Sequence, residues 1–269
     1  MAATKDTLVY LNIEIGDQEL KAQALDMYNR GRAFFETHGA LYGYAGRNLE
    51  DLDVEDRQNL QDIYDSNPVL TKGGQILLSP PAPLPGGRLV IRLDTEGCPK
   101  TSDNFLAFAE SRFAAQVKGA TYMNTQLFRL VPNHIIQGGD FTKNDGSGGH
   151  SIYPTIDNPR PFADERNGLK KNKFVKRGIL AMANRGKNTN GSQFFLTIGE
   201  GTRWSKTLDG NYVAFGEVLE DEADKASAGQ DNVWNGIQLL DQLNKVPTDE
   251  EERPIRAITI VGCGRLGSK

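Results

Sequence analysis

The sequence predicts a mainly β protein, a closed antiparallel barrel interrupted by a helical insert. Three observations support this fold class. Short segments of alternating apolar residues recur from residue 86 onward, separated by Gly, Asn and Asp turns. Two helical patterns frame these segments, and a closed barrel leaves no strand edge exposed. Between residues 17 and 86 the apolar period changes from that of a strand to that of a helix.

The first strand is expected within residues 7–16. Its side chains alternate between two faces, as in a half-buried strand: Leu8, Tyr10, Asn12 and Glu14 on one face, and Val9, Leu11, Ile13 and Ile15 on the other. The next strand of this kind is 88–93 (RLVIRL). Further along the chain, helices are expected near 101–118 and 233–243, and a last strand at 258–266.

The insert, residues 17–86, is expected to contain two helices. The first has about 18 residues, with an apolar stripe at Leu20, Ala24, Met27, Gly31 and Phe34. The second extends from Leu49 to Tyr64, with expected buried positions at Leu49, Leu52, Leu60, Ile63 and Tyr64. Acidic residues dominate segment 48–65, which indicates either a solvated face or an acidic docking surface. Segment 79–87 (SPPAPLPGG) is expected to be a stiff, extended connector that ends in a flexible turn.

Composition excludes several classes of function. The net charge is −4, with 31 Lys and Arg against 35 Asp and Glu, so the chain lacks the basic field that nucleic acid or an anionic membrane requires. No apolar run suits a leader or a membrane span, so we expect a soluble protein that is not secreted. The two cysteines, Cys98 and Cys263, form no pair motif and favour a reducing compartment, cytoplasmic or also nuclear.

Three motifs are weak indicators of a ligand. Residues 262–267 (GCGRLG) match a dinucleotide pattern, but too little chain follows for the helix that this site needs. The histidines, His38, His134 and His150, are scattered, so we expect no metal and no cofactor. The basic cluster Lys170, Lys171, Lys173, Lys176 and Arg177 is expected to be solvated, although nucleic-acid contact is the alternative.

The most informative segment is 128–141 (FRLVPNHIIQGGDF), because it places one arginine and one glutamine among apolar residues on apparent strands. Placing a cation over an apolar surface costs free energy, so an arginine at such a position indicates a functional role. Segment 178–196 (GILAMANRGKNTNGSQFFL) adds two strands around a polar turn. With 94–105 (DTEGCPKTSDNF), 146–153 (GSGGHSIY), 208–210 (LDG), 213–216 (VAFG) and 258–266, these blocks resemble the cyclophilins, the peptidyl-prolyl cis-trans isomerases.

The resemblance covers about residues 7–16 and 86–269 and implies an eight-stranded barrel with a helix capping each end. It implies one isomerase domain, 7–269, interrupted by the insert, that binds proline-containing peptides or proteins and assists folding or conformational switching. It further implies that Arg129 and Gln137 are catalytic. The substrate-binding positions that it implies are His134, Ile135, Ala183, Asn184, Arg185, Gln193, Phe195, Leu208 and Tyr212.

The chemistry of such a site needs one well-positioned hydrogen-bond donor and an apolar pocket for the proline ring. Rotation of an X-Pro bond breaks amide resonance, so the proline nitrogen gains a lone pair that the planar state lacks. A guanidinium that donates to this nitrogen therefore binds the twisted state better than the planar one. Turnover near 10² to 10³ per second requires lowering the barrier by roughly 5–7 kcal/mol. Clamping of the flanking peptide must supply part of that.

This sequence departs from the family pattern within the pocket. His134 and Ile135 replace a phenylalanine and a methionine, Arg185 replaces an alanine, and Tyr212 replaces a histidine. Thr207 stands where the family has the tryptophan on which cyclosporin binding depends, and Trp204 lies upstream, so cyclosporin binding stays open. We expect altered peptide specificity and reduced activity. The alternative is a catalytically weak scaffold module, docked to a protein partner through residues 17–86.

Overall fold

The computed structural model describes residues 7–170, 173–199, 205–220 and 233–267. The chain divides into two compact units, one made of Met1–Gly16 with Pro85–Lys269 and the other of Asp17–Leu84. We call the first the barrel unit and the second the insert. Each unit is considered by itself below.

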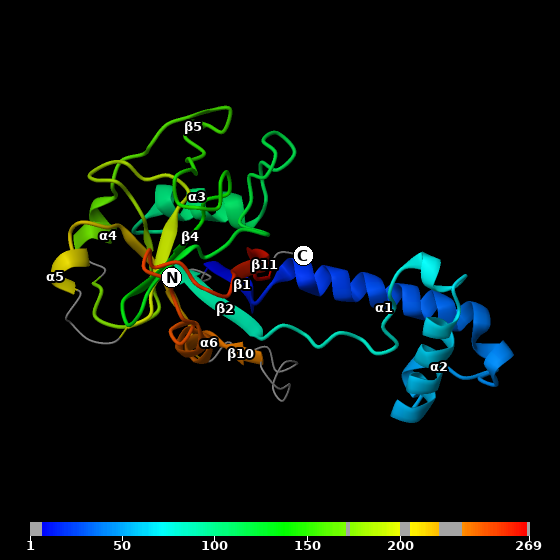
Figure 1. The fold of residues 1–269 in the computed structure, drawn as a ribbon. Coiled ribbons are helices and arrows are strands. Elements are labelled where there is room, and N and C mark those ends of the chain that lie inside the picture. The colour runs from blue at the N-terminus through cyan, green and yellow to red at the C-terminus, as the bar shows by residue number, and fades with distance from the viewer. Residues whose placement is uncertain (1–6, 171–172, 200–204, 221–232, 268–269) are drawn as a thin grey trace. The chain divides into compact units, whose positions relative to one another are not determined.

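The barrel unit is built on a curled antiparallel sheet of eight strands in the order β11-β1-β2-β9-β7-β8-β4-β3 (Figure 1). The strands are β1 (Thr7–Ile15), β2 (Gly86–Leu93), β3 (Arg129–Val131), β4 (Ile135–Gly138), β7 (Ile179–Met182), β8 (Phe194–Thr197), β9 (Ala214–Val218) and β11 (Ile258–Arg265). The segment before β3 also bonds to β11: Leu127 N donates to Ile258 O at 2.8 Å, and Ile260 N donates to Thr125 O at 2.9 Å. These bonds join the two ends of the sheet, and the predicted fold class is confirmed.

The first strand shows how its sequence pattern sets its role. The side chains of Val9, Leu11, Ile13 and Ile15 are at most 3% exposed, whereas the alternate residues from Leu8 to Glu14 are half-buried. Strand β1 pairs with β2 on one side and with β11 on the other. One face therefore enters the core while both strand edges are satisfied by neighbours.

Smaller strands complete the unit. Strands β5 (Pro154–Thr155) and β6 (Asn158–Pro159) form a separate two-stranded sheet. Strand β10 (Val233–Asn235) pairs with β2 in parallel. The helix expected from 233 therefore begins only after this strand, as α6 (Gly236–Leu243).

Two helices lie on opposite sides of the strands in Figure 1, α3 (Pro99–Ala109) above and α6 below. Helix α3 is shorter than the expected 101–118, because the chain turns at Ser111, whose φ of 53° is left-handed. Helix α6 buries Leu239, Leu240 and Leu243. The short helices α4 (Arg166–Lys170) and α5 (Ser205–Leu208) were not expected from the sequence.

The insert contains α1 (Gln18–His38), η1 (Gly39–Tyr42), η2 (Leu49–Asp51), α2 (Val54–Ser66) and η3 (Thr71–Gly73). The expected second helix is thus split, because Asp53 caps α2 by accepting a hydrogen bond from Asp56 N at 2.8 Å. The expected stripe of α1 is also only partly right. Gly31 and Phe34 are buried, but Leu20 is 61% exposed.

The insert has its own hydrophobic core. Its buried residues are Tyr28, Phe34, Phe35, Leu49, Leu52, Leu60, Tyr64, Ile76 and Leu78. The returning segment crosses α1 at Gly31, where a Cβ atom would lie 2.0 Å from Leu77 O, so only glycine permits this approach. Segment 80–84, with its prolines, forms neither helix nor strand, as the connector prediction implies. The flexible turn expected at Gly86 and Gly87 is wrong, because both residues pair with β1 as the first residues of β2.

Candidate active site

The pairing of adjacent strands brings both predicted catalytic residues and one predicted pocket residue, Phe195, into one row. Arg129 on β3 lies opposite Gln137 on β4, and Gln137 lies opposite Phe195 on β8. Phe195 in turn lies opposite Ala181 on β7. Residues directly opposite one another project from the same face of a sheet, so this row carries a cation, an amide and an aromatic ring side by side.

Hydrogen bonds extend from the arginine along that row. Arg129 Nη1 donates to Gln137 Oε1 at 3.4 Å, and Gln137 Nε2 donates to Gln193 Oε1 at 2.9 Å. Gln193 Nε2 donates to Gly146 O at 2.9 Å and to Gly148 O at 2.7 Å. Both amides are thereby fixed in orientation. These bonds form one continuous polar network from Arg129 to the glycine-rich loop.

The glycine-rich loop is held by the carboxylate of Asp140, which is fully buried. Its Oδ1 accepts from Lys143 N at 3.0 Å, and its Oδ2 accepts from Gly146 N at 3.0 Å and Gly148 N at 2.9 Å. Burial acts to raise the pKa of Asp140, but these bonds to the charged form outweigh it and lower the pKa to about 2. The carbonyl groups of Gly146 and Gly148, which accept hydrogen bonds from Gln193, are therefore rigidly placed.

An apolar cluster separate from the main core forms the floor of the site. Its buried members are Ile135, Phe174, Ile179, Ala181, Phe195, Leu208 and Ala214, and Val131, Ala183 and Tyr212 pack against them. The rings of Phe195 and Tyr212 meet edge to face, with centroids 5.3 Å apart. Such a cluster beside Arg129 offers apolar contact to a proline ring.

His134 lies at the tip of the β3–β4 hairpin. The turn is made by Asn133, whose φ of 57° is left-handed, and it is closed by His134 N donating to Val131 O at 3.0 Å. Partial burial lowers the pKa of His134, the nearby Arg129 lowers it further, and Glu252 partly offsets both. The imidazole is therefore neutral at neutral pH.

The loop after β7 carries three further predicted residues. Ala183 N donates to Gln193 O at 2.9 Å, which ties this loop to β8. The exposed Arg185 reaches the glycine-rich loop, where its Nη2 donates to Ser147 O at 3.0 Å. The side-chain oxygen of Asn184 accepts a hydrogen bond from Gly186 N at 3.2 Å, and its Nδ2 lies 3.4 Å from Asn211 O. Its amide is thus held mainly through the oxygen.

The structure places two residues at the site that sequence reasoning missed. Glu252 Oε2 accepts from Arg129 Nε at 2.7 Å and lies 2.6 Å from Arg129 Nη2. Phe174 stacks on Phe195 with ring centroids 5.8 Å apart. Glu252 lies in an acidic run far along the chain, and Phe174 in a basic segment. Neither position has a local pattern that indicates contact with the site.

Other sequence predictions resolve as follows. Two members of the basic cluster form ion pairs within the barrel unit: Lys176 with Glu217 at 2.6 Å, and Arg177 with Asp241. Residues 262–264 of the dinucleotide-like motif lie within β11. Both cysteines are free thiols. Lys171 and Trp204 lie outside the described residues, so the prediction for cyclosporin remains open.

Two negative findings apply to the described part of the chain. It contains no group of three or more His, Cys, Asp or Glu residues arranged to hold a metal ion. None of its helices is both long and apolar enough to cross a membrane.

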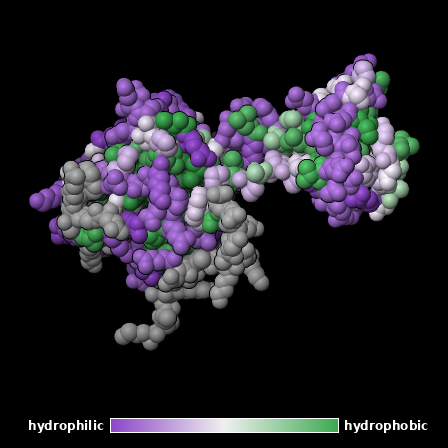
Figure 2. Space-filling view, turned by 60° about the horizontal axis from the view of Figure 1, so that its bottom comes forward, coloured by the Kyte–Doolittle hydropathy of each residue, from purple (hydrophilic) through white to green (hydrophobic). Residues whose placement is uncertain are grey.

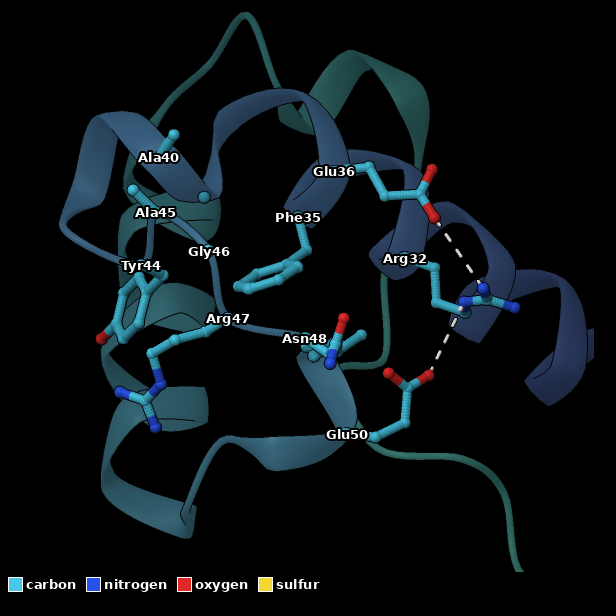
Figure 3. Close-up of a pocket in the computed structure, with 12 residues that line it drawn as sticks. Arg32, Phe35, Glu36, Ala40, Tyr44, Ala45, Gly46, Arg47, Asn48 and Glu50 are labelled. Carbon is cyan, nitrogen blue, oxygen red and sulfur yellow. Dashed lines mark ion pairs between the residues drawn. The ribbon is translucent and has the colours of Figure 1, made fainter.

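The insert has a concavity of its own, shown in Figure 3. It lies between the end of α1 and the loop that leads to η2, with Phe35 and Tyr44 among its walls. Arg32 points between Glu36 and Glu50, at 3.8 Å from each, and Arg47 pairs with Asp56 at 2.8 Å. The charges around this concavity are thus largely balanced within the insert.

Comparison with known proteins gives consistent matches. Residues 84–265 match the family described as cyclophilin type peptidyl-prolyl cis-trans isomerase. Peptidyl-prolyl cis-trans isomerase B of Saccharomyces cerevisiae is 38% identical over 178 residues, which cover 66% of this chain and 72% of the relative. The peptidyl-prolyl cis-trans isomerase of Encephalitozoon cuniculi is 43% identical over 183 residues, covering 68% and 88%.

A solved structure matches in the same region. It is a Cryptosporidium parvum cyclophilin type peptidyl-prolyl cis-trans isomerase in the presence of the dipeptide Ala-Pro. Its sequence is 33% identical, the TM-score is 0.52, and the match covers 68% of this chain and 94% of that one.

Proposed function

This chain belongs to the cyclophilin type peptidyl-prolyl cis-trans isomerases, and we propose that the row of Arg129, Gln137 and Phe195 carries its isomerase reaction. The observation that supports this assignment most directly is the register of β3, β4 and β8. It places the guanidinium, the amide and the apolar floor next to one another although they come from separate parts of the chain.

In this proposal a proline ring contacts the apolar floor while Arg129 donates to the amide nitrogen as it loses planarity. Gln137 orients the guanidinium, since its Oε1 lies 3.4 Å from Nη1 and its own amide is fixed by Gln193. Ala183 and Asn184 hold the peptide backbone on the other side of Gln193. No proton is transferred and no covalent bond forms, so the catalytic power comes from transition-state binding and positioning.

The test is Arg129→Ala in the full chain, compared with Arg253→Ala. Arg253 is an exposed arginine on the turn beside Glu252, so it controls for the loss of one positive charge. We expect Arg129→Ala to lower kcat/KM by about 10²-fold or more, with thermal stability nearly unchanged. The activity of Arg253→Ala should stay near wild type. Wild-type turnover in Arg129→Ala would show that the assignment is wrong.

We also propose a cellular role and a compartment. Substrates would be proline-containing segments of proteins that fold or switch conformation, as expected for an enzyme acting on X-Pro bonds. The free thiols of Cys98 and Cys263 support a reducing compartment, the cytoplasm or the nucleus. Fractionation of cells that express the tagged full chain tests the compartment.

For the insert, we propose docking to a partner with a basic surface. Residues 17–84 contain 11 acidic and 6 basic side chains, a net charge of −5, whereas the whole chain has a net charge of −4, so the excess of negative charge lies in the insert. Figure 2 shows apolar patches among polar residues on its visible face, and Leu41, Val54 and Val69 are more than 70% exposed. Acidic and apolar groups on one compact unit suit a protein partner better than a small ligand.

A further inference from the structure

The catalytic arginine is held by a carboxylate from the turn before β11. A single oxygen of Glu252 accepts from Arg129 Nε at 2.7 Å and lies 2.6 Å from Nη2. Nη1, by contrast, lies near Gln137. A peptide that approaches Arg129 therefore meets an arginine that is already paired, with an anion beside it. Both side chains are 41% exposed, so a charged group on the peptide can reach this pair.

The backbone fixes Glu252 at this place. Its carbonyl accepts from Leu130 N at 2.8 Å, which attaches the turn to β3, and its own N–H donates to Asp249 O at 3.1 Å. Its φ of 62° is in the left-handed region, where glycine is favoured over any residue with a side chain. The chain thus tolerates unfavourable backbone geometry at the residue whose side chain contacts both Nε and Nη2 of Arg129.

We propose that Glu252 is a specificity-determining residue, which favours peptides with a cationic side chain next to the proline and disfavours those with an anionic one. This inference rests on the role of Arg129 in the proposed function. A cation on the peptide is attracted by the carboxylate and weakens its hold on Arg129, leaving the guanidinium available to the twisted amide. An anion is repelled by Glu252, and it competes with the amide for Arg129.

The expected size follows from Coulomb's law. Two unit charges about 7 Å apart in a partly solvated site change a binding constant by roughly three- to sevenfold. Replacing Lys by Glu in the peptide reverses the sign, so the carboxylate should change the Lys-to-Glu ratio of kcat/KM by about tenfold or more. Salt should reduce the effect, because both charges are accessible to solvent.

Arg185 acts in the opposite sense. It carries an exposed cation on the loop after β7, which favours peptides with an acidic residue near the proline. The Lys-to-Glu ratio of kcat/KM in the wild type reflects both residues together, so it does not show the effect of either one alone. Substitutions separate them, because removal of Glu252 lowers the Lys-to-Glu ratio and Arg185→Ala raises it.

The experiment measures kcat/KM without a coupling protease for peptides with Lys, Ala or Glu immediately before or after the proline. The proteins are the full-length wild type, Glu252→Gln, Glu252→Gly and Glu251→Gln. Glu251 is an exposed acid on the same turn, so Glu251→Gln is the matched control for charge. Assays at about pH 8 keep His134 neutral. Glu252→Gly removes the carboxylate and also the strain of a side chain at a left-handed φ. It therefore tests whether a change in stability, and not the loss of charge, explains a change in the Lys-to-Glu ratio.

We expect the Lys-to-Glu ratio to fall about tenfold in both Glu252 variants at low salt and to change little in Glu251→Gln. Glu252→Gly should unfold at the same or a higher temperature than wild type. The inference is overturned if the Glu252 variants keep the wild-type ratio, or if Glu251→Gln shifts the ratio equally. Turnover that persists in Arg129→Ala would instead overturn the proposed function, and this inference with it.

Discussion

At the scale of single residues, His134 lies near the ion pair of Arg129 and Glu252, and both charges act on its pKa. Its pKa is lowered from the usual 6.5, first by burial and then by Arg129, whereas Glu252 acts to raise it. The folded protein therefore binds this proton less readily than the unfolded chain does. The contribution of His134 to stability is present above about pH 6.5 and is lost as the pH falls, because the unfolded state is protonated first.

We predict that kcat/KM decreases as the pH falls through the lowered pKa of His134, by about tenfold for each pH unit below it. Protonation adds a second cation near Arg129 and places a charge on a partly buried side chain. His134→Phe should remove this acid limb, and Glu252→Gln should move it to lower pH, since Glu252 is the group that raises the pKa. A flat wild-type profile between pH 5 and about 7 would show that His134 does not control activity.

At the scale of one element, the glycine-rich loop depends on Asp140. Its carboxylate accepts hydrogen bonds from the N–H groups of Lys143, Gly146 and Gly148. Because its pKa is about 2 in the folded state against a usual 3.8, its stabilising effect is complete above about pH 4 and is lost as the pH falls toward 2. Carbonyl groups of this loop also accept hydrogen bonds from Gln193, so the geometry of the site depends on the Asp140 carboxylate.

We predict that Asp140→Asn lowers the free energy of unfolding at pH 7 by about 1–3 kcal/mol, because an amide nitrogen would face backbone N–H groups. It should also raise KM more than it lowers kcat, since the carbonyl partners of Gln193 become mobile. Denaturant unfolding at several pH values checks this, with Asp157→Asn as control, because Asp157 is exposed and lies outside the glycine-rich loop. The difference from wild type should shrink toward pH 2. A difference that stays constant with pH would contradict the assignment.

At the scale of the whole molecule, the insert interrupts the barrel at a single connection. Ile15 N donates to Pro85 O at 2.7 Å, and Glu14 lies opposite Gly86, so the chain leaves and re-enters the sheet at adjacent points. The buried residues of the insert lie within its own sequence. Insertions at such connections are tolerated because the pairing on either side is complete without them.

We predict that replacing Asp17–Leu84 by an Asn-Gly turn preserves the barrel fold and peptide turnover but abolishes capture of a basic partner in pull-downs. Circular dichroism and the isomerase assay test the first part. For the second, Asp62→Asn with Asp65→Asn in the full chain should weaken capture, whereas the acidic control Asp145→Asn should not. An insoluble or inactive shortened protein would mean that the insert belongs to the barrel core, and unchanged capture would place recruitment elsewhere.

Much of the fold could be predicted because its signals are local. The alternation in β1 gave the strand and its buried face, and the change of period after Ile15 gave the helical insert. Errors arose where long-range contacts override local preference. Segment 233–235 pairs with β2 and so is a strand, and Leu20, although on the apolar stripe, is exposed. The left-handed turn at Ser111 likewise has no strong local signal.

The sequence by itself determined the family, the identity of the residues that can do the chemistry, and the departures at His134, Arg185 and Tyr212, because motifs and residue types are carried by the chain. Only the tertiary structure decided which groups meet. Strand register aligned Arg129 with Gln137 and Phe195, and the turn before β11 brought Glu252 to Arg129 across 123 residues. Contacts between distant segments depend on register and backbone geometry, and neither is encoded in a local pattern.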